Sequence, residues 1–142
     1  MRLTVLRRKT LTCSMNKCDN IMKITLPYPP SVNTYWRAIG RGRVILSKKG
    51  REYRQEVAYE AVRQRGAIRK RPLEGRVKID IMAWMPDKRR RDLDNILKAT
   101  LDSLVHAAGL LLDDEQIDDL RIRRAGVEKP GRLEVKLTEI KC

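Results

Sequence analysis

The chain has 142 residues, enough for one globular domain that buries a core without disulfide bonds or a structural metal. Lysine and arginine total 32 against 18 acidic residues, which gives a formal net charge of +14. This excess favours nucleic acid as a partner over a membrane, because no apolar run approaches the roughly 20 residues of a spanning helix. A basic surface that serves only solubility is the alternative.

The first 21 residues are polar and basic and show no sustained periodicity. We expect a disordered N-terminal extension over 1–21, followed by a single domain over 22–142. The cysteines, Cys13, Cys18 and Cys142, form no CxxC pair and lie at the two ends of the chain. With one histidine, His106, they predict free thiols in a reducing cytoplasm rather than a zinc site. Arg7 and Arg8 are not followed by an apolar segment, so no secretory signal is expected.

The first half of the domain predicts two strands and a helix. A strand over 22–26 ends at Pro27, because proline cannot continue a hydrogen-bonded ladder. Residues 31–43 have the composition of a loop, and 44–46 form a second short strand. Ser47 is a typical N-cap for a helix over 48–65, which Gly66 closes. This helix has one apolar side and one basic side.

The second half predicts a strand over 76–84, in which Val77, Ile79, Ile81 and Ala83 share one face. A helix follows whose apolar residues recur at three- and four-residue steps up to Gly109. Two last strands, near 117–124 and 132–140, are predicted to form a hairpin through the turn at 129–131. The elements together indicate a small α+β domain with a mixed β-sheet and two main helices.

Acidic residues interrupt the basic surface at both ends of the second helix. The segment PDKRRRDLDN brings Asp87, Asp92 and Asp94 next to three arginines, and Asp113-Asp114-Glu115 follows the helix. Asp92 can serve as a helix N-cap, and acids in the first turn suit the helix dipole. Carboxylates are also the ligands that Mg²⁺ prefers, and phosphodiester hydrolysis needs such an ion.

Lys98 lies four residues after Asp94, on the same side of the helix. It can form a surface ion pair with Asp94 or contact a scissile phosphate, and spacing alone leaves both open. Pro86-Asp87 with Glu134-Val135-Lys136 imitates another nuclease motif, but both halves are short and strand alternation produces the second. Nucleases with histidine metal ligands need more histidines than His106, which we interpret as a packing or surface residue.

Four segments, in order, resemble the RusA family of Holliday junction resolvases over roughly residues 22–140. They are ITLPYPPSVNTYWR, MPDKRRRDLDNILKATLDSL, GLLLDDEQIDDLRI and GRLEVKLTEI. The resemblance implies a small α+β fold, a homodimer and bacterial or phage origin. It also implies Mg²⁺-dependent cutting of four-way junction DNA, with Mn²⁺ able to substitute and no nucleotide cofactor.

By motif position, the metal-binding and catalytic acids of the family fall on Asp92, Asp94 and Asp114, and its essential lysine falls on Lys98. Asp113 is either an additional ligand or a turn-former. The loop before it looks one residue longer than the family pattern, which leaves the choice between Asp113 and Asp114 open. Residues 110–112 either pack in the core or serve a dimer interface. We expect the neighbouring phosphates to be held by Lys88, Arg89, Arg90, Arg91, Lys48, Lys49, Arg51 and Arg54.

Overall fold

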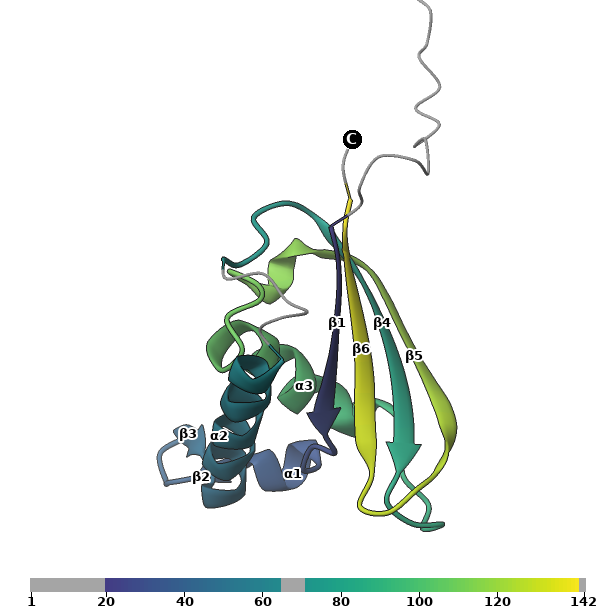
Figure 1. Ribbon diagram of the computed structural model, residues 1–142. Coiled ribbons are helices and arrows are strands. Elements are labelled where there is room, and N and C mark those ends of the chain that lie inside the picture. Colours follow the sequence, from purple (N-terminus) through teal and green to yellow (C-terminus); the bar gives the residue numbers. More distant parts are fainter. Residues whose placement is uncertain (1–19, 65–70, 141–142) are drawn as a thin grey trace, which may run out of the picture.

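The computed structural model describes residues 20–64 and 71–140. It contains one four-stranded sheet, a separate two-stranded ribbon, and helices on one side of the larger sheet (Figure 1). The strands are β1 (Ile21–Pro27), β2 (Trp36–Ala38), β3 (Val44–Leu46), β4 (Val77–Met85), β5 (Ile117–Val127) and β6 (Arg132–Glu139). The helices are α1 (Val32–Tyr35), α2 (Lys48–Arg63), α3 (Asp94–His106) and the 3-10 turn η1 (Asp114–Gln116).

The four-stranded sheet has the order β1-β6-β4-β5. β6 runs antiparallel to both β1 and β4, whereas β4 and β5 are parallel and are connected through α3. Alternate residues of β4 are buried, and Val77, Ile79, Ile81 and Ala83 are fully inaccessible. The predicted apolar face of this strand is therefore confirmed, and it forms the centre of the core beneath the helices.

The predicted hairpin between the last two strands is wrong. β5 and β6 do not pair with each other, because β4 lies between them and pairs with both. The connection at 128–131 crosses the end of β4, where the Glu128 N–H donates to the Met85 carbonyl at 2.8 Å. Gly131 has φ +87° and passes so close to Pro86 that a Cβ atom would lie 3.0 Å from the Pro86 nitrogen. The chain does turn at 129–131, but the turn carries it across the end of β4 and does not join two neighbouring strands.

The two main helices are confirmed with shifted ends. α2 ends at Arg63, before the predicted Gly66, which lies outside the described residues. α3 begins at Asp94, and its N-cap position is Leu93, so the prediction of Asp92 as N-cap is wrong. Its deepest residues are Ile96, Ala99, Thr100, Ser103 and Leu104. The leucines at 97 and 101, on which the helix was predicted, are only partly buried.

Other boundaries differ slightly from the sequence-based expectation. β1 begins at Ile21, and the Asn20 side chain donates to Glu139 at 2.6 Å, so the domain starts at least two residues earlier than residue 22. Residues 31–43 hold α1 and β2 rather than a loop alone. The rest of the expected extension and all three cysteines lie outside the described residues. No helix in the described ranges has the length and apolar character needed to cross a membrane.

Candidate active site

The loop between β4 and α3 is held in shape by Asp87. Its carboxylate accepts two hydrogen bonds from the guanidinium of Arg91, one of them at 2.9 Å, and a third from the Arg89 N–H at 2.9 Å. These bonds, the one with Arg91 first, hold the pKa of Asp87 well below its usual range. The guanidinium of Arg124, on β5, donates to the Arg91 carbonyl and fixes the loop from the other side. Asp87 therefore orders the loop.

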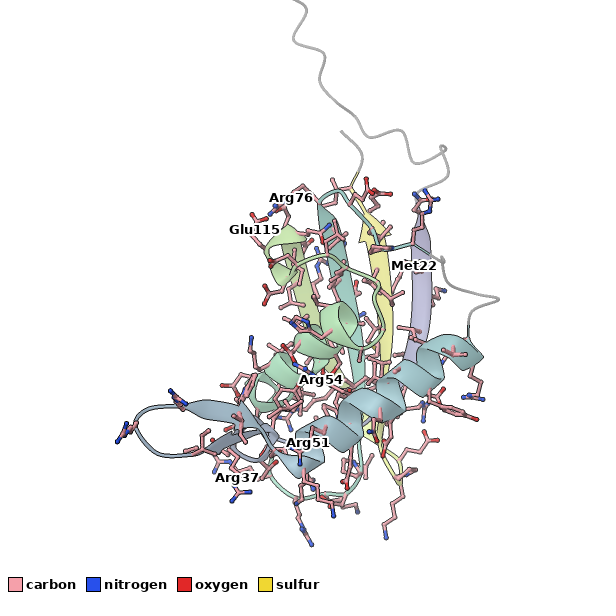
Figure 2. The ribbon with its side chains drawn as sticks, turned by 90° about the vertical axis from the view of Figure 1, so that its left-hand side faces the viewer. Met22, Arg37, Arg51, Arg54, Arg76 and Glu115 are labelled. Carbon is pink, nitrogen blue, oxygen red and sulfur yellow. The ribbon has the colours of Figure 1, made fainter. Side chains whose placement is uncertain are left out.

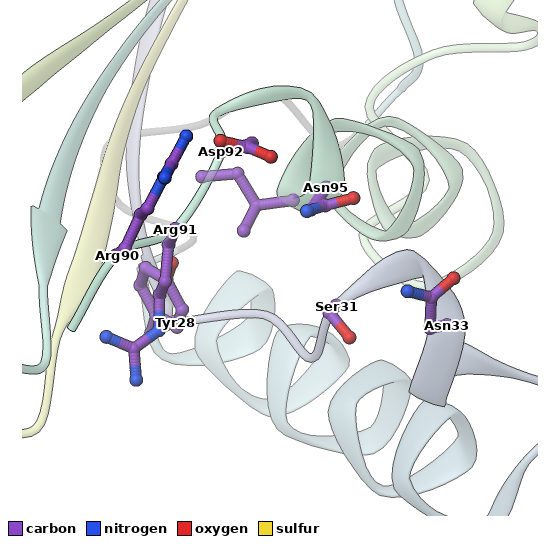
Figure 3. Close-up of a pocket in the computed structure, with 8 residues that line it drawn as sticks. Tyr28, Ser31, Asn33, Arg90, Arg91, Asp92 and Asn95 are labelled. Carbon is purple, nitrogen blue, oxygen red and sulfur yellow. The ribbon is translucent and has the colours of Figure 1, made fainter.

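Asp92 lies in a pocket where this loop meets the start of α1 (Figure 3). In the close-up, Tyr28 and the two arginines lie on one side, and Ser31 and Asn33 lie on the other. The Asp92 side chain is exposed and accepts no hydrogen bond from the described residues. The pocket is lined by Tyr28, Ser31, Asn33, Arg90, Arg91, Asp92, Asn95 and Ile96.

Lys98 and Asp114 line a second pocket, on the side of α3. The chain after α3 turns back along the helix, so the second acidic cluster lies at the level of Lys98, one helical turn beyond Asp94. Sequence spacing alone did not establish this return. The pocket is lined by Lys98, Asp102, Val105, His106, Leu112, Asp113 and Asp114.

Asp113 has a structural task in this pocket. Its side chain accepts the N–H of Glu115 at 2.9 Å, and the Gln116 side chain accepts the N–H of Asp113 at 3.0 Å. This reciprocal capping starts η1 and aims the cluster at α3. The bond from Glu115 is the main reason why the pKa of Asp113 is lowered. The structure shows the turn-forming role, and metal binding by Asp113 stays a prediction.

Asp102 belongs to the same pocket, and sequence analysis did not single it out. Its Oδ2 atom accepts hydrogen bonds from the Tyr35 hydroxyl and from Arg54, whose Nε lies 3.1 Å away. His106 Nε2 lies 3.7 Å from the other carboxylate oxygen. Burial alone would raise the pKa of Asp102, but the bonds from Tyr35 and Arg54 outweigh it and the pKa is lowered. The sequence did contain a signal for a buried carboxylate here. Asp102 lies between the apolar Leu101 and the small Ser103, four residues after Lys98.

The candidate metal ligands are divided between the two pockets, with Asp92 in the first and Asp114 in the second. Within residues 20–64 and 71–140, no three carboxylate, histidine or cysteine side chains gather as a metal-binding group. The donor chemistry nevertheless fits a hard cation that keeps most of its waters and takes one or two carboxylates. Asp92 and Asp94 are exposed, and neither carboxylate is engaged by another described residue.

The basic residues predicted to hold phosphates fall into two groups. Lys88 and Arg90 are exposed on the loop before α3, and Lys49 is exposed on α2. The others have partners in the protein, including the exposed Arg89, whose Nε lies 3.9 Å from Asp87. Arg91 is bound to Asp87, Arg54 to Asp102, Arg51 Nη1 to the Leu46 carbonyl at 3.0 Å, and Lys48 lies 3.9 Å from Glu52. DNA contact by these residues stays a prediction.

Known proteins resemble this chain over most of its length. A sequence model of the family Endodeoxyribonuclease RusA matches residues 27–138. The chain is 48% identical over 126 residues to the crossover junction endodeoxyribonuclease rusA of Enterobacteria phage HK97. It is 46% identical over 121 residues to proteins of the same name from Enterobacteria phage 82 and Escherichia coli strain K12. Each alignment covers 85% of this chain and 97% of the relative. The chain belongs to the RusA family of endodeoxyribonucleases.

Proposed function

We propose that this protein is a Mg²⁺-dependent endodeoxyribonuclease that resolves Holliday junctions by paired, symmetric nicks during recombination and repair. The observation that carries the proposal is the return of the second acidic cluster to Lys98, one turn from Asp94, in a member of the RusA family. Its relatives are named crossover junction endodeoxyribonucleases and come from phages and bacteria. A bacterial cytoplasm is where we expect it to meet such DNA.

Asp92, Asp94 and Asp114 are the residues we expect to hold the metal. All three side chains are exposed; Asp94 is the first residue of the helix that carries Lys98, and Asp92 lies in the loop before it. Bound there, Mg²⁺ would lower the pKa of a water molecule and neutralise charge on the phosphoryl oxygens. The carboxylates would also accept hydrogen bonds from that water and so orient it. Asp113 supports the site by holding η1 in place.

Lys98 is exposed on α3 and forms no hydrogen bond or ion pair with the described residues. Its ammonium group is therefore available to a phosphate, where it would stabilise negative charge that develops during in-line attack. Arg90 lines the pocket that contains Asp92, so it is placed to hold the adjacent phosphate. Lys88 and Arg89 extend this basic surface along the loop. The products would be nicked duplexes with 5′-phosphate and 3′-hydroxyl ends.

A homodimer fits this task, because a four-way junction has two-fold symmetry and a C₂ dimer presents two equivalent sites. Leu110 and Leu111 are buried in the core, so of this run only Leu112, 58% exposed, is available to a partner subunit. Mixed dimers test the arrangement directly. Wild-type protein co-expressed with an excess of the Asp94→Asn variant should form mixed dimers that nick only one strand of each junction. If the protein acted as independent monomers, the wild-type copies would still nick both strands, one after the other.

Cleavage of a labelled four-way junction in Mg²⁺, with unlabelled linear duplex as competitor, tests the proposed function. Asp94→Asn should abolish cutting and leave junction binding equal or tighter, because one negative charge facing DNA is removed. The matched control is Asp119→Asn, on β5, which removes a half-buried carboxylate outside both pockets.

Paired nicks that disappear in EDTA and in Asp94→Asn, but persist in Asp119→Asn, would support the proposal. Tight junction binding without cuts, in Mg²⁺ and Mn²⁺ and across several junction sequences, would instead identify a DNA-binding protein without nuclease activity. Equal cutting of the linear competitor would identify a nuclease of another substrate class.

A further inference from the structure

We propose that the hairpin of β2 and β3, residues 36–46, is an arm that grips DNA backbone beside the candidate active site through Arg37, Arg41 and Arg43. The inference rests on the proposed function only in taking DNA as the ligand. None of these three arginines was among the residues that the sequence predicted to contact DNA. The hairpin is a separate two-stranded ribbon that projects beyond α2 (Figure 2).

The backbone gives the hairpin a defined shape. Trp36, Arg37 and Ala38 pair with Leu46, Ile45 and Val44, and the Ile39 N–H donates to the Arg43 carbonyl at 3.0 Å. The tip Gly40-Arg41-Gly42 has three consecutive positive φ angles, of 74°, 48° and 70°. Two of the three residues are glycines, which adopt positive φ angles without strain. The turn therefore closes tightly and leaves the Arg41 side chain at the very end of the arm.

The charge of the arm is not neutralised by any acidic residue in the part of the chain that the structure describes. Arg37, Arg41 and Arg43 are exposed, and none of them forms an ion pair or hydrogen bond with a described residue through its side chain. No acidic residue occurs between Asp19 and Glu52 in the sequence. Elsewhere the arginines are commonly paired, as Arg76 is with Asp118 and Arg132 with Glu128. Three like charges on one short ribbon repel one another unless an anion lies between them.

Apolar side chains on the same arm complement the arginines. Ile39 is 46% exposed, Val44 58% and Ile45 40%, although β-branched residues of this size normally pack in a core. A two-stranded ribbon with both charged and apolar exposed residues fits a DNA groove, where arginine meets phosphate and apolar side chains meet sugar or base faces. A water-exposed loop without a ligand would gain nothing from these three apolar residues.

The base of the arm is linked through Tyr35 to α3, the helix that carries Lys98. The Ser47 N–H donates to the Tyr35 carbonyl at 2.9 Å, and Arg51 donates to the Leu46 carbonyl. The Trp36 ring packs edge-on against Tyr35, with ring centroids 5.1 Å apart. The Tyr35 hydroxyl in turn donates to Asp102 on α3, one turn from Lys98. DNA held by the arm is thereby placed at a set position relative to Lys98.

The test is binding of a labelled synthetic four-way junction to the full chain in EDTA, measured over a range of salt concentrations. The variant Arg37→Gln/Arg41→Gln/Arg43→Gln keeps both glycines of the turn. The plot of log K against log salt has a negative slope, and each lost phosphate contact makes it about 0.9 less steep. For the triple variant we expect the magnitude of the slope to fall by about 2 to 3, and the affinity to weaken at least about tenfold. The triple lysine variant, which keeps the charge, should recover most of the binding.

The matched control is Lys23→Gln/Arg123→Gln/Lys136→Gln, which removes three positive charges from the sheet surface away from the helices. It should change the slope by less than half as much as the arm variant. An arm variant with wild-type slope and affinity, or a control variant with the same loss, would overturn the inference. Because binding is measured without metal, these outcomes are independent of whether the wild-type protein cuts junctions.

Discussion

Arg54, labelled on α2 in Figure 2, donates a hydrogen bond from Nε to Oδ2 of Asp102 at 3.1 Å, and this ion pair joins α2 to α3. The Asp102 side chain is 9% exposed and the Arg54 side chain 30%. Tyr35 shares the same carboxylate oxygen. Arg54, predicted from its sequence position to hold a phosphate, is therefore first of all a partner of Asp102.

Replacing Asp102 with alanine should destabilise the protein by about 3 kcal/mol, because removal of one partner leaves Arg54 partly buried without its counter-charge. Urea unfolding followed by circular dichroism measures this free energy. Asp119→Ala is the control. Asp119 lies 3.8 Å from Lys78 in a more exposed pair, whose loss should cost about 0.5 kcal/mol or less. Equal losses in the two variants would show that the Asp102 network adds no stability.

Stability should fall in acid partly because of the same carboxylate. The pKa of Asp102 is lowered in the folded protein, so the unfolded chain binds its proton more readily. Its contribution is present above the unfolded pKa of about 3.9 and is lost as the pH falls through the lower folded value. The free energy of unfolding, measured between neutral pH and about pH 3, should therefore depend less on pH in Asp102→Asn. An unchanged pH slope would contradict this assignment.

Lys98→Met should lower the rate of junction cleavage at saturating protein by at least about 100-fold, the usual loss when one charged donor to the reacting phosphate is removed. Binding should weaken only slightly, since one positive charge among many is lost. Single-turnover cleavage together with binding in EDTA separates the two effects. Lys136→Met, on the outer surface of the sheet, is the control and should cut normally. If Lys98→Met binds poorly and cuts normally once bound, Lys98 is a binding residue.

Asp87→Ala should release Arg91 and loosen the loop that places Asp92. Misplacement of a reacting group by about 1 Å can lower the rate about 100-fold, so we expect the cleavage rate of the variant to fall by about 10- to 100-fold. Junction affinity should be equal or higher, because Arg91 becomes free to contact phosphate. The comparison is Asp118→Ala, which breaks an ion pair with Arg76 far from the loop. Normal cleavage by Asp87→Ala would show that the loop keeps its shape without this bond.

The sequence by itself determined the local structure and the identity of the candidate catalytic residues. Alternation in β4, apolar periodicity in α3 and the Ser47 cap predicted these elements within a few residues, because each depends on neighbours in the chain. The RDLDNILK segment at 91–98 marked Asp92, Asp94 and Lys98 by family motif, and the LDDEQ segment at 112–116 marked Asp114. The family comparison confirmed the resemblance, not the individual roles.

Only the tertiary structure decided which strands pair and which side chains meet. The turn at 129–131 predicted a reversal of the chain, but insertion of β4 between β5 and β6 depends on pairing across more than forty residues of sequence. Three side-chain contacts could not be predicted from the sequence for a related reason. They are the cap formed by Asp113, the binding of Arg91 by Asp87, and the contact of Arg54 with Asp102. Each depends on the direction of a side chain in the folded protein, and an isolated basic or acidic residue in a sequence does not reveal its partner.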